Sequence, residues 1–142
     1  MADKGKNFES LIDRWLTELK VYHHRFMDSR SMGRIGTSQP ADYFVWFEGK
    51  LIYLELKDYS GTSLAFNSFS PSQWKSAIKG NSNNIIHIAV IRLNSVIYGI
   101  NMQNLIDYIQ SPDTTRKSFS IAFLEEFGLI ITNKHELLSF LL

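Results

Sequence analysis

The chain has 142 residues, of which 44% are hydrophobic and 20% are charged, and its formal net charge is +1. This length and composition predict a single folded domain, residues 1–142, and exclude a globally disordered chain. The absence of cysteine excludes disulfides, thiolate metal sites and a cysteine nucleophile. Because the sequence shows neither an apolar signal core nor an apolar run of about 18 residues, we expect a soluble, cytoplasmic protein that does not contact the membrane.

The first predicted element is a helix that begins at Phe8. Glu9 lies beside its apolar stripe in the first turn. This carboxylate is either a favourable charge at the positive end of the helix or a further acidic group that faces a metal site. The stripe recurs at the helical spacing of three and four residues and consists of Phe8, Leu11, Ile12, Trp15, Leu16 and Leu19.

The segment from Tyr22 to Arg34 is basic, contains a glycine and has weak periodicity, which predicts a flexible loop. His23 and His24 are adjacent, so they cannot easily share one metal ion, and we expect them at the surface. A solvated loop and a DNA-binding loop are both consistent with this composition. The candidate contacts to the DNA backbone, here and in two other segments, are Lys4, Lys6, Arg25, Arg30, Arg34, Lys75 and Lys79.

The stretch from Pro40 to Lys57 predicts a β-hairpin around which the rest of the chain is organised. Tyr43–Phe47 and Leu51–Leu56 are rich in aromatic and branched residues, and a Glu-Gly-Lys turn separates them. Strand alternation places one set of side chains of the second strand toward a core: Ile52, Leu54 and Leu56. The opposite face of the same strand carries Tyr53, Glu55 and Lys57.

A hairpin returns Asp42, at the start of the first strand, toward the end of the second. We therefore expect Asp42, Glu55 and Lys57 to converge at one end of a sheet. Two carboxylates are hard oxygen ligands of the kind that Mg²⁺ prefers, and a lysine beside them can orient a water or stabilise a phosphorane. This set suits metal-assisted phosphodiester hydrolysis, although an exposed strand edge with a cross-strand ion pair would give the same residue pattern.

After the hairpin, Asp58 to Ser68 is polar and predicts a loop. Ser70-Pro71-Ser72-Gln73 then predicts the start of a helix, because serine is a good N-cap, proline suits the first position and glutamine can close a capping box. We expect the helix to turn Trp74, Ala77 and Ile78 inward and to end at Gly80. Gln73 therefore has a structural explanation that requires no role in catalysis.

Ile85 to Leu93 is an almost continuous apolar run, which is typical of a strand buried on both faces. We expect His87 within it to be a hydrogen-bonded core residue and not a metal ligand. Val96–Ile100 predicts a second strand, and Asn101 the cap of a further helix. A short helix at Ala122–Phe127, a brief strand and an apolar C-terminal turn tucked into the core or a subunit interface complete an α/β fold with a mixed sheet flanked by helices.

With these residues in place, the sequence resembles the PD-(D/E)xK nuclease superfamily and, within it, the RecU family of Holliday-junction resolvases, including phage-borne relatives. The resemblance covers most of the chain and rests on the order and spacing of short motifs. They are Gly5-Lys6-x-Phe8-Glu9, Asp42-Tyr43, Gly49-Lys50, Glu55-x-Lys57, Phe69-x-x-x-Gln73, the strand pair Ile85–Leu93 and Val96–Ile100, and Arg116-Lys117-Ser118.

The resemblance implies a restriction-endonuclease-like core and a homodimeric endonuclease that uses Mg²⁺, or Mn²⁺ as a substitute, to nick four-way DNA junctions symmetrically. It assigns metal binding to Asp42, Glu55 and Leu56 and the positioning of water to Lys57. It adds Glu9 and Gln73 to the catalytic set. One feature departs from the family: residues 22–39 are too few for its long basic stalk, which occupies the centre of the junction.

Two other functions are compatible with the same residues. One is a nuclease of the same fold with another specificity, such as a repair or restriction-like nickase. The other is a DNA-binding module that has no catalytic activity. The sequence has no glycine-rich phosphate loop, so we expect no nucleotide cofactor.

Overall fold

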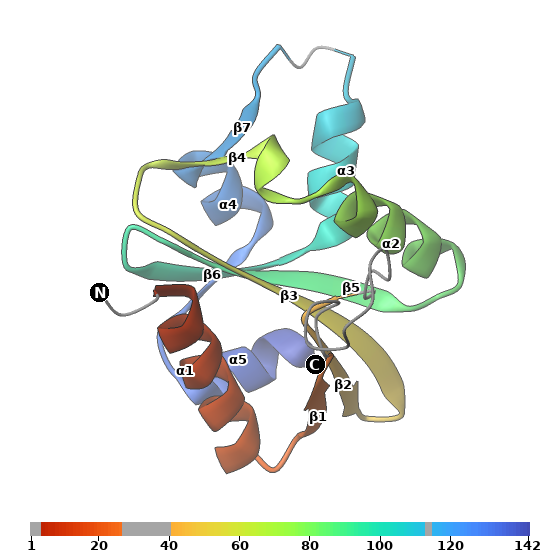
Figure 1. Cartoon of the computed structure of the whole chain (residues 1–142), viewed down its shortest axis with the longest axis vertical. Coiled ribbons are helices and arrows are strands. Elements are labelled where there is room, and N and C mark those ends of the chain that lie inside the picture. The colour runs from red at the N-terminus through yellow and green to blue at the C-terminus, as the bar shows by residue number, and fades with distance from the viewer. Residues whose placement is uncertain (1–3, 27–40, 113–114) are drawn as a thin grey trace, which may run out of the picture.

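The computed structural model describes residues 4–26, 41–112 and 115–142, including side chains from residue 7 onward (Figure 1). These residues form a mixed six-stranded sheet, a separate two-stranded sheet and five α-helices. The elements in chain order are α1 (Lys4–Glu18), β1 (Tyr22–Arg25), β2 (Tyr43–Phe47), β3 (Lys50–Tyr59), β4 (Ser63–Ala65), the 3₁₀ helix η1 (Phe66–Ser68), α2 (Pro71–Ser82), β5 (Ile86–Leu93), β6 (Val96–Asn101), α3 (Met102–Gln110), β7 (Ser118–Ser120), α4 (Ile121–Phe127), β8 (Leu129–Ile131) and α5 (Lys134–Leu141).

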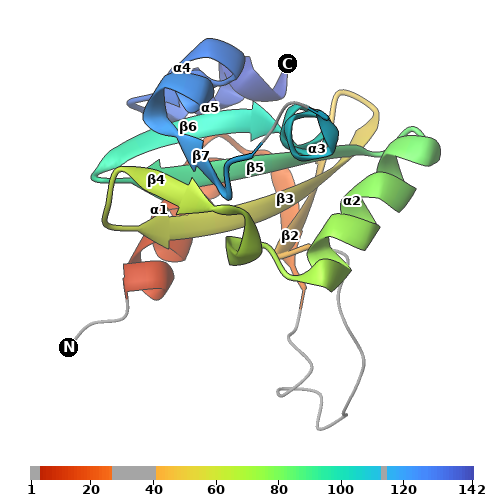
Figure 2. The ribbon, with the colours of Figure 1, turned by 90° about the horizontal axis from the view of Figure 1, so that it is seen from above.

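The large sheet has the strand order β1-β2-β3-β5-β6-β8. Neighbouring strands run antiparallel except β3 and β5, which are parallel and pair from Ile52–Ile86 to Tyr59–Leu93. A parallel pair needs a crossover connection, and here the connection contains β4 and α2. Seen from above, β3, β5 and β6 lie side by side (Figure 2). Strand β3 is therefore a central strand of the sheet and not an edge, which decides the environment of Glu55.

Two hydrophobic cores lie on the two faces of the large sheet. Helices α1 and α5 cover one face, where Phe8 and Leu16 pack with Val45 and Leu54. Helices α2, α3 and α4, with the β4–β7 sheet, cover the other face over β5 and β6 (Figure 1). The α/β fold with a mixed sheet flanked by helices was predicted from the sequence and is confirmed. No helix among the described residues is long and apolar enough to cross a membrane.

The predicted turn and caps are present. Glu48 and Gly49 have φ angles of 53° and 72°, as a two-residue hairpin turn between twisted strands requires. Ser70 caps α2 in a full capping box with Gln73. Asn101 caps α3 by accepting from the Gln103 N–H, and Asn133 caps α5 in the same way. In the apolar C-terminal segment, expected to be tucked into the core or an interface, Leu137 and Leu141 are buried in the core, whereas Leu142 is 69% exposed.

Three predicted segments differ from the structure. Tyr22–Arg25, expected to begin a loop, is a strand, because β2 offers it an antiparallel partner that local sequence cannot reveal. The segment expected to be a loop from Asp58 completes β3 and then forms β4 and η1. Helix α2 continues past Gly80 to Ser82, and Ile78, expected to point inward, is exposed on its outer face.

Candidate active site

The hairpin brings Asp42 and Glu55 together through main-chain contacts. The Asp42 N–H donates to Glu55 Oε1 at 3.0 Å, and the Leu56 N–H donates to Asp42 Oδ2 at 2.8 Å. Each carboxylate is thus held by a backbone N–H at or beside the other residue. Because β3 lies between β2 and β5, the Glu55 side chain is completely buried. The two carboxylates are therefore adjacent and fixed in position, and Glu55 is shielded from bulk water.

One oxygen of this pair has no hydrogen-bond partner. Glu55 Oε2 is buried and accepts no hydrogen bond, which is costly for a carboxylate. Burial, followed by the neighbouring Asp42 charge, raises the pKa of Glu55 from its usual 4.5 to about 8. Burial is also the main cause that raises the pKa of Asp42 above its usual value. A cation beside these oxygens would supply the missing partner and offset the repulsion between the carboxylates.

The donor set fits a hard divalent cation, since Mg²⁺ is bound by one or two carboxylates together with waters and phosphate oxygens. The described residues contain no group of three or more His, Cys, Asp or Glu side chains that could hold a metal ion. Among the described residues, the carboxylate ligands at this position would be Asp42 and Glu55. Leu56, the third predicted metal ligand, has no side-chain donor, so only its main-chain oxygen is available for an ion.

Lys57 lies on the same face of β3 as Glu55 and is held by the start of helix α2. Its Nζ donates to Gln73 Oε1 at 3.1 Å and lies 5.0 Å from the centre of the Phe69 ring. The same Gln73 oxygen accepts the Ser70 N–H at 2.9 Å, which closes the capping box. Gln73 therefore both caps the helix and restrains the lysine, and its structural explanation does not exclude a role at the site.

Glu9 does not join the carboxylate pair. It forms an ion pair with Arg25 and accepts a hydrogen bond from the Tyr43 hydroxyl at 3.4 Å. Because α1 begins at Lys4, Glu9 lies beyond the first helical turn, and the interpretation of this residue as a charge at the helix N-terminus is wrong. The Glu9 charge still acts on the Asp42 carboxyl, where it is one of the smaller causes of the raised pKa.

The Tyr43 hydroxyl donates its shorter hydrogen bond to Asp13 Oδ2, at 3.0 Å. Burial and this bond raise the pKa of Tyr43 well above its usual value. Asp13 was not singled out from the sequence. Its position four residues after Glu9 places the two carboxylates on the same face of α1, and this spacing is the signal that could have found it.

The structure places the predicted DNA-contacting residues in different environments. Lys75 and Lys79 are exposed on α2, as expected. Arg25 lies in strand β1 and not in a loop, and its guanidinium is paired with Glu9. The remaining predicted contacts fall outside the described part of the chain: the side chains of Lys4 and Lys6, and the whole of Arg30 and Arg34.

The adjacent histidines His23 and His24 lie on β1, where alternation turns them to opposite faces of the sheet. His24 is exposed as expected, whereas His23 is half-buried, with its ring Nε2 3.4 Å from Asp13 Oδ1. His87 is buried as predicted, but neither of its ring nitrogens has a hydrogen-bond partner, so the expectation of a hydrogen-bonded core histidine is wrong.

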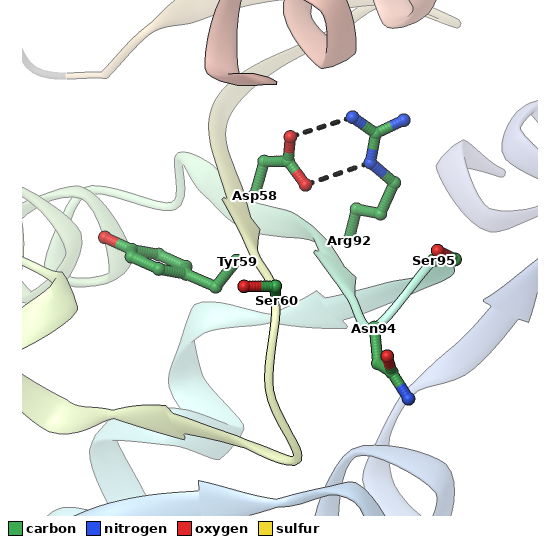
Figure 3. Close-up of a pocket in the computed structure, with 6 residues that line it drawn as sticks. All are labelled: Asp58, Tyr59, Ser60, Arg92, Asn94 and Ser95. Atoms are coloured by element: carbon green, nitrogen blue, oxygen red, sulfur yellow. Dashed lines mark hydrogen bonds and ion pairs between the residues drawn. The ribbon is translucent and has the colours of Figure 1, made fainter. Parts of the chain in front are cut away.

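A separate pocket of about 350 Å³ lies at the far end of β3 and β5 (Figure 3). Figure 3 shows Asp58 and Arg92 pointing toward each other, joined by hydrogen bonds of 2.9 and 2.8 Å. Arg92 also lies 4.8 Å from the centre of the Phe8 ring. Alternation places Asp58 on the α1 side of the sheet, opposite to Lys57, so this pocket does not share the face of the carboxylate pair. Its lining consists of Asp58, Tyr59, Ser60, Arg92, Asn94 and Ser95.

Comparison with known proteins identifies the fold. No protein-family model matches this sequence, and no curated protein matches it significantly. Among solved structures, the chain is similar to Archaeoglobus fulgidus Hjc, a Holliday junction resolvase from an archaeal hyperthermophile. The TM-score is 0.60 at 15% sequence identity, and the match covers 89% of this chain and 95% of that chain. The protein therefore has the same restriction-endonuclease-like α/β fold as that structure.

Proposed function

We propose that this protein is a metal-dependent endodeoxyribonuclease that cleaves branched DNA, most specifically a Holliday-junction resolvase that makes symmetric nicks. The observation that carries the proposal is the buried pair Asp42–Glu55, with a partnerless carboxylate oxygen and Lys57 on the same face. Similarity to the fold of Hjc supports a nuclease over other α/β functions. The sequence resemblance supports a relative of the RecU family, including its phage-borne members, as the finer assignment.

Each residue of the site has a distinct part in this proposal. Asp42 and Glu55 would hold Mg²⁺, which when bound lowers the pKa of a water and neutralises charge on the scissile phosphate. Lys57 donates from a fixed position, because Gln73 and the Phe69 ring restrain it, and it orients the attacking water or stabilises the phosphorane. Attack in line with the leaving oxygen breaks the phosphodiester and releases a 5′-phosphate product.

The stabilisation of the transition state depends on prior organisation of these groups. The reciprocal N–H contacts at 3.0 and 2.8 Å fix both carboxylates before substrate arrives. Lys57 is likewise already ordered, so little reorganisation is needed when negative charge develops on the phosphate. Glu9, tied to Arg25, is a positioning residue in this scheme: it affects the charge at Asp42 without contacting the reacting atoms.

Symmetric resolution requires two cuts on two strands, so we propose that the active form is a homodimer with one site in each protomer. A nuclease of the same fold that acts on simple nicks or duplexes needs no such pairing. The short segment from residue 22 to residue 39, in place of a stalk, favours neither specificity. The two candidates are separated by substrate preference and by whether the nicks are paired.

The test is cleavage of a labelled four-way junction, a matched linear duplex and the single strands, in Mg²⁺ and in EDTA. Wild type is compared with Glu55→Gln and Lys57→Ala, and each variant is checked for folding by circular dichroism. Lys134→Ala is the matched control for Lys57→Ala, because Lys134 lies on α5 and contacts Glu18 at 3.3 Å, away from the site. We expect Mg²⁺-dependent paired nicks in the junction from wild type and the control only.

Other outcomes lead to different conclusions. Equal cutting of all substrates would retain the nuclease and reject junction specificity. Tight junction binding without cleavage in Mg²⁺ or Mn²⁺ would identify a non-catalytic DNA-binding module. Full activity of folded Glu55→Gln would refute the site assigned here.

A further inference from the structure

The β1–β2 end of the sheet carries an aromatic surface next to the candidate active site. Cross-strand pairing places Tyr22 opposite Trp46, His24 opposite Phe44, and Phe44 opposite Tyr53. Alternation puts these side chains on the face that carries Glu55 and Lys57. We call this surface the aromatic face; it consists of Tyr22, His24, Phe26, Phe44, Trp46 and Tyr53.

The rings of the aromatic face are close together. Phe44 is central, with ring centroids of Tyr22, His24 and Phe26 at 6.0, 5.7 and 5.6 Å. Phe26 continues the series to Tyr53 at 6.0 Å. These separations are typical of interacting aromatic pairs, so these five rings form a continuous surface, and strand pairing places Trp46 opposite Tyr22 at its edge.

Tyr22, His24 and Trp46 are exposed on this surface, whereas Tyr43 and Val45 on the opposite face of β2 are buried. Tyr22 is 66% exposed and Trp46 is 52% exposed, while Tyr43 and Val45 on the other side of β2 are 2% and 0% exposed. Among the described residues, the core that α2, α3 and α4 form on this face of the sheet includes residues of β5 and β6 and none of β1 or β2. In Figure 1, β1 and β2 extend away from α3 and α4. Exposed aromatic side chains gathered in one patch mark a binding surface and not ordinary solvent-facing strand positions.

The aromatic face is continuous with the carboxylate pair. The Phe26 N–H donates to the Asp42 carbonyl at 2.9 Å. Tyr53 lies two residues before Glu55 on the same strand and the same face, which separates the two side chains by about 7 Å. A planar group stacked near Tyr53 would therefore lie beside a phosphate held at the carboxylate pair.

A cleft joins the aromatic face to helix α2 at Tyr53. It has a volume of about 470 Å³ and is lined by Tyr53, Ser76, Lys79, Gly80, Asn83 and Ile85. Lys79 supplies a cation, and Ser76 and Asn83 supply polar side chains. Rings for stacking beside a cation and hydrogen-bonding groups are the combination with which proteins bind unpaired nucleotides.

We infer that the aromatic face binds unstacked bases of a DNA strand next to the scissile phosphate. This inference rests on the proposed function and specifies its substrate as DNA with unpaired or opened bases beside the cut. Stacking tolerates any base sequence, because each base has a π-face, whereas a fully paired duplex hides these faces. The aromatic face would therefore select opened strands over paired duplex, and the carboxylate pair would act on the phosphodiester beside them.

The test measures binding separately from cleavage. A short fluorescent thymidine oligonucleotide is titrated in EDTA, followed by anisotropy, against wild type, Tyr22→Ala, Trp46→Ala and Trp46→Phe. Phe127→Ala is the matched control, because Phe127 is 49% exposed on α4. We expect each alanine variant at Tyr22 or Trp46 to bind roughly 5- to 100-fold more weakly, from the stacking of one base, with Trp46→Phe and the control close to wild type.

A second readout distinguishes stacking from charge. Loss of a stacking contact lowers affinity without changing the slope of affinity against salt, whereas loss of a phosphate contact reduces that slope. Binding of a matched duplex should change little in the Tyr22 and Trp46 variants. A 2-aminopurine placed beside the cut should lose fluorescence on binding wild type and not on binding folded Tyr53→Ala, because Tyr53 is the ring of the aromatic face that lies two residues from Glu55.

Several results would overturn the inference. These are no binding of the oligonucleotide by wild type, unchanged affinity in folded Tyr22→Ala and Trp46→Ala, or an equal loss on duplex. Conversion of a dimer to a monomer by these variants, seen by light scattering, would instead make the face a subunit interface. Because EDTA prevents cleavage, a protein that never cuts junctions but shows the expected stacking loss would refute the proposed function alone. A junction-cutting enzyme without that loss would refute the inference alone.

Discussion

The change Glu55→Gln should make the metal-free protein more stable at alkaline pH while it abolishes cleavage. Burial and the Asp42 charge raise the pKa of Glu55 from 4.5 to about 8 in the folded protein. The folded state thus binds the Glu55 proton more tightly than the unfolded chain does. Stability from this group is complete below about pH 4.5, is lost as pH rises through the folded pKa, and stays low above about pH 8. Glutamine is neutral throughout and escapes the loss.

The magnitude follows from the two pKa values. At about 1.4 kcal/mol for each tenfold change in proton affinity, the ionised Glu55 side chain costs at most about 5 kcal/mol. For a domain of this size that is roughly 15 °C in Tm. The variant keeps an oxygen that can accept the Asp42 N–H, the contact that Glu55 Oε1 makes at 3.0 Å. The gain should therefore not be cancelled by a broken hydrogen bond.

The assay is thermal denaturation in EDTA at about pH 5 and about pH 9, followed by circular dichroism. We expect wild type and Glu55→Gln to melt within a few degrees of each other at the lower pH and the variant to melt higher at the upper pH. Adding Mg²⁺ at the upper pH should raise the Tm of wild type and leave the variant unchanged, because binding to the folded state alone stabilises it. A Tm difference that is the same at both pH values would refute this account of Glu55.

Other residues give further expectations. Burial lowers the pKa of His87 to about 4, so stability should fall by up to about 3 kcal/mol as pH drops from 6.5 through 4, and His87→Phe should remove this acid sensitivity in pH-dependent melts. Gln73→Ala should lower kcat and change KM little, because it releases Lys57. It should also lower the free energy of unfolding by about 1 kcal/mol, because half of the capping box is lost, whereas Gln73→Glu, which keeps an acceptor, should restore part of kcat. Arg92→Met should cost about 2 kcal/mol in urea unfolding, because it leaves the Asp58 carboxylate, 6% exposed, without its partner; the double variant with Asp58→Asn should recover much of the loss.

The sequence was sufficient to predict the hairpin and the convergence of Asp42 with Glu55. Alternation along β3 and the turn at Gly49 fix which residues face each other, and both signals are local. The pairing of Arg25 with Glu9 could not be predicted, because it requires strand β1, which exists only through its contact with β2. Local patterns describe neighbours in the chain, whereas this pair is brought together by the sheet.

The burial of Glu55 also could not be predicted from the sequence. An E-x-K triplet reads the same on an exposed edge as on a central strand. What buries Glu55 is the arrival of β5 beside β3, after a crossover through α2 that returns the chain in parallel. The same arrival buries His87 without a hydrogen-bond partner. Glu55 and His87 are the buried polar or charged residues of the described core, and both lie on the parallel pair.

The unfavourable free energy of burying the Glu55 carboxylate is informative, because a neutral residue at this position would avoid it. A neutral or apolar residue at this position would pack in the sheet without desolvating a charge and without repelling Asp42. A carboxylate with a buried, partnerless oxygen is instead stabilised only when a proton or a cation joins it. If Mg²⁺ binds here as proposed, a proton and the ion would compete for the same oxygens in neutral solution, which would couple cation binding to folding stability. The feature that weakens the metal-free fold is therefore the one that would give the site its affinity for a metal ion.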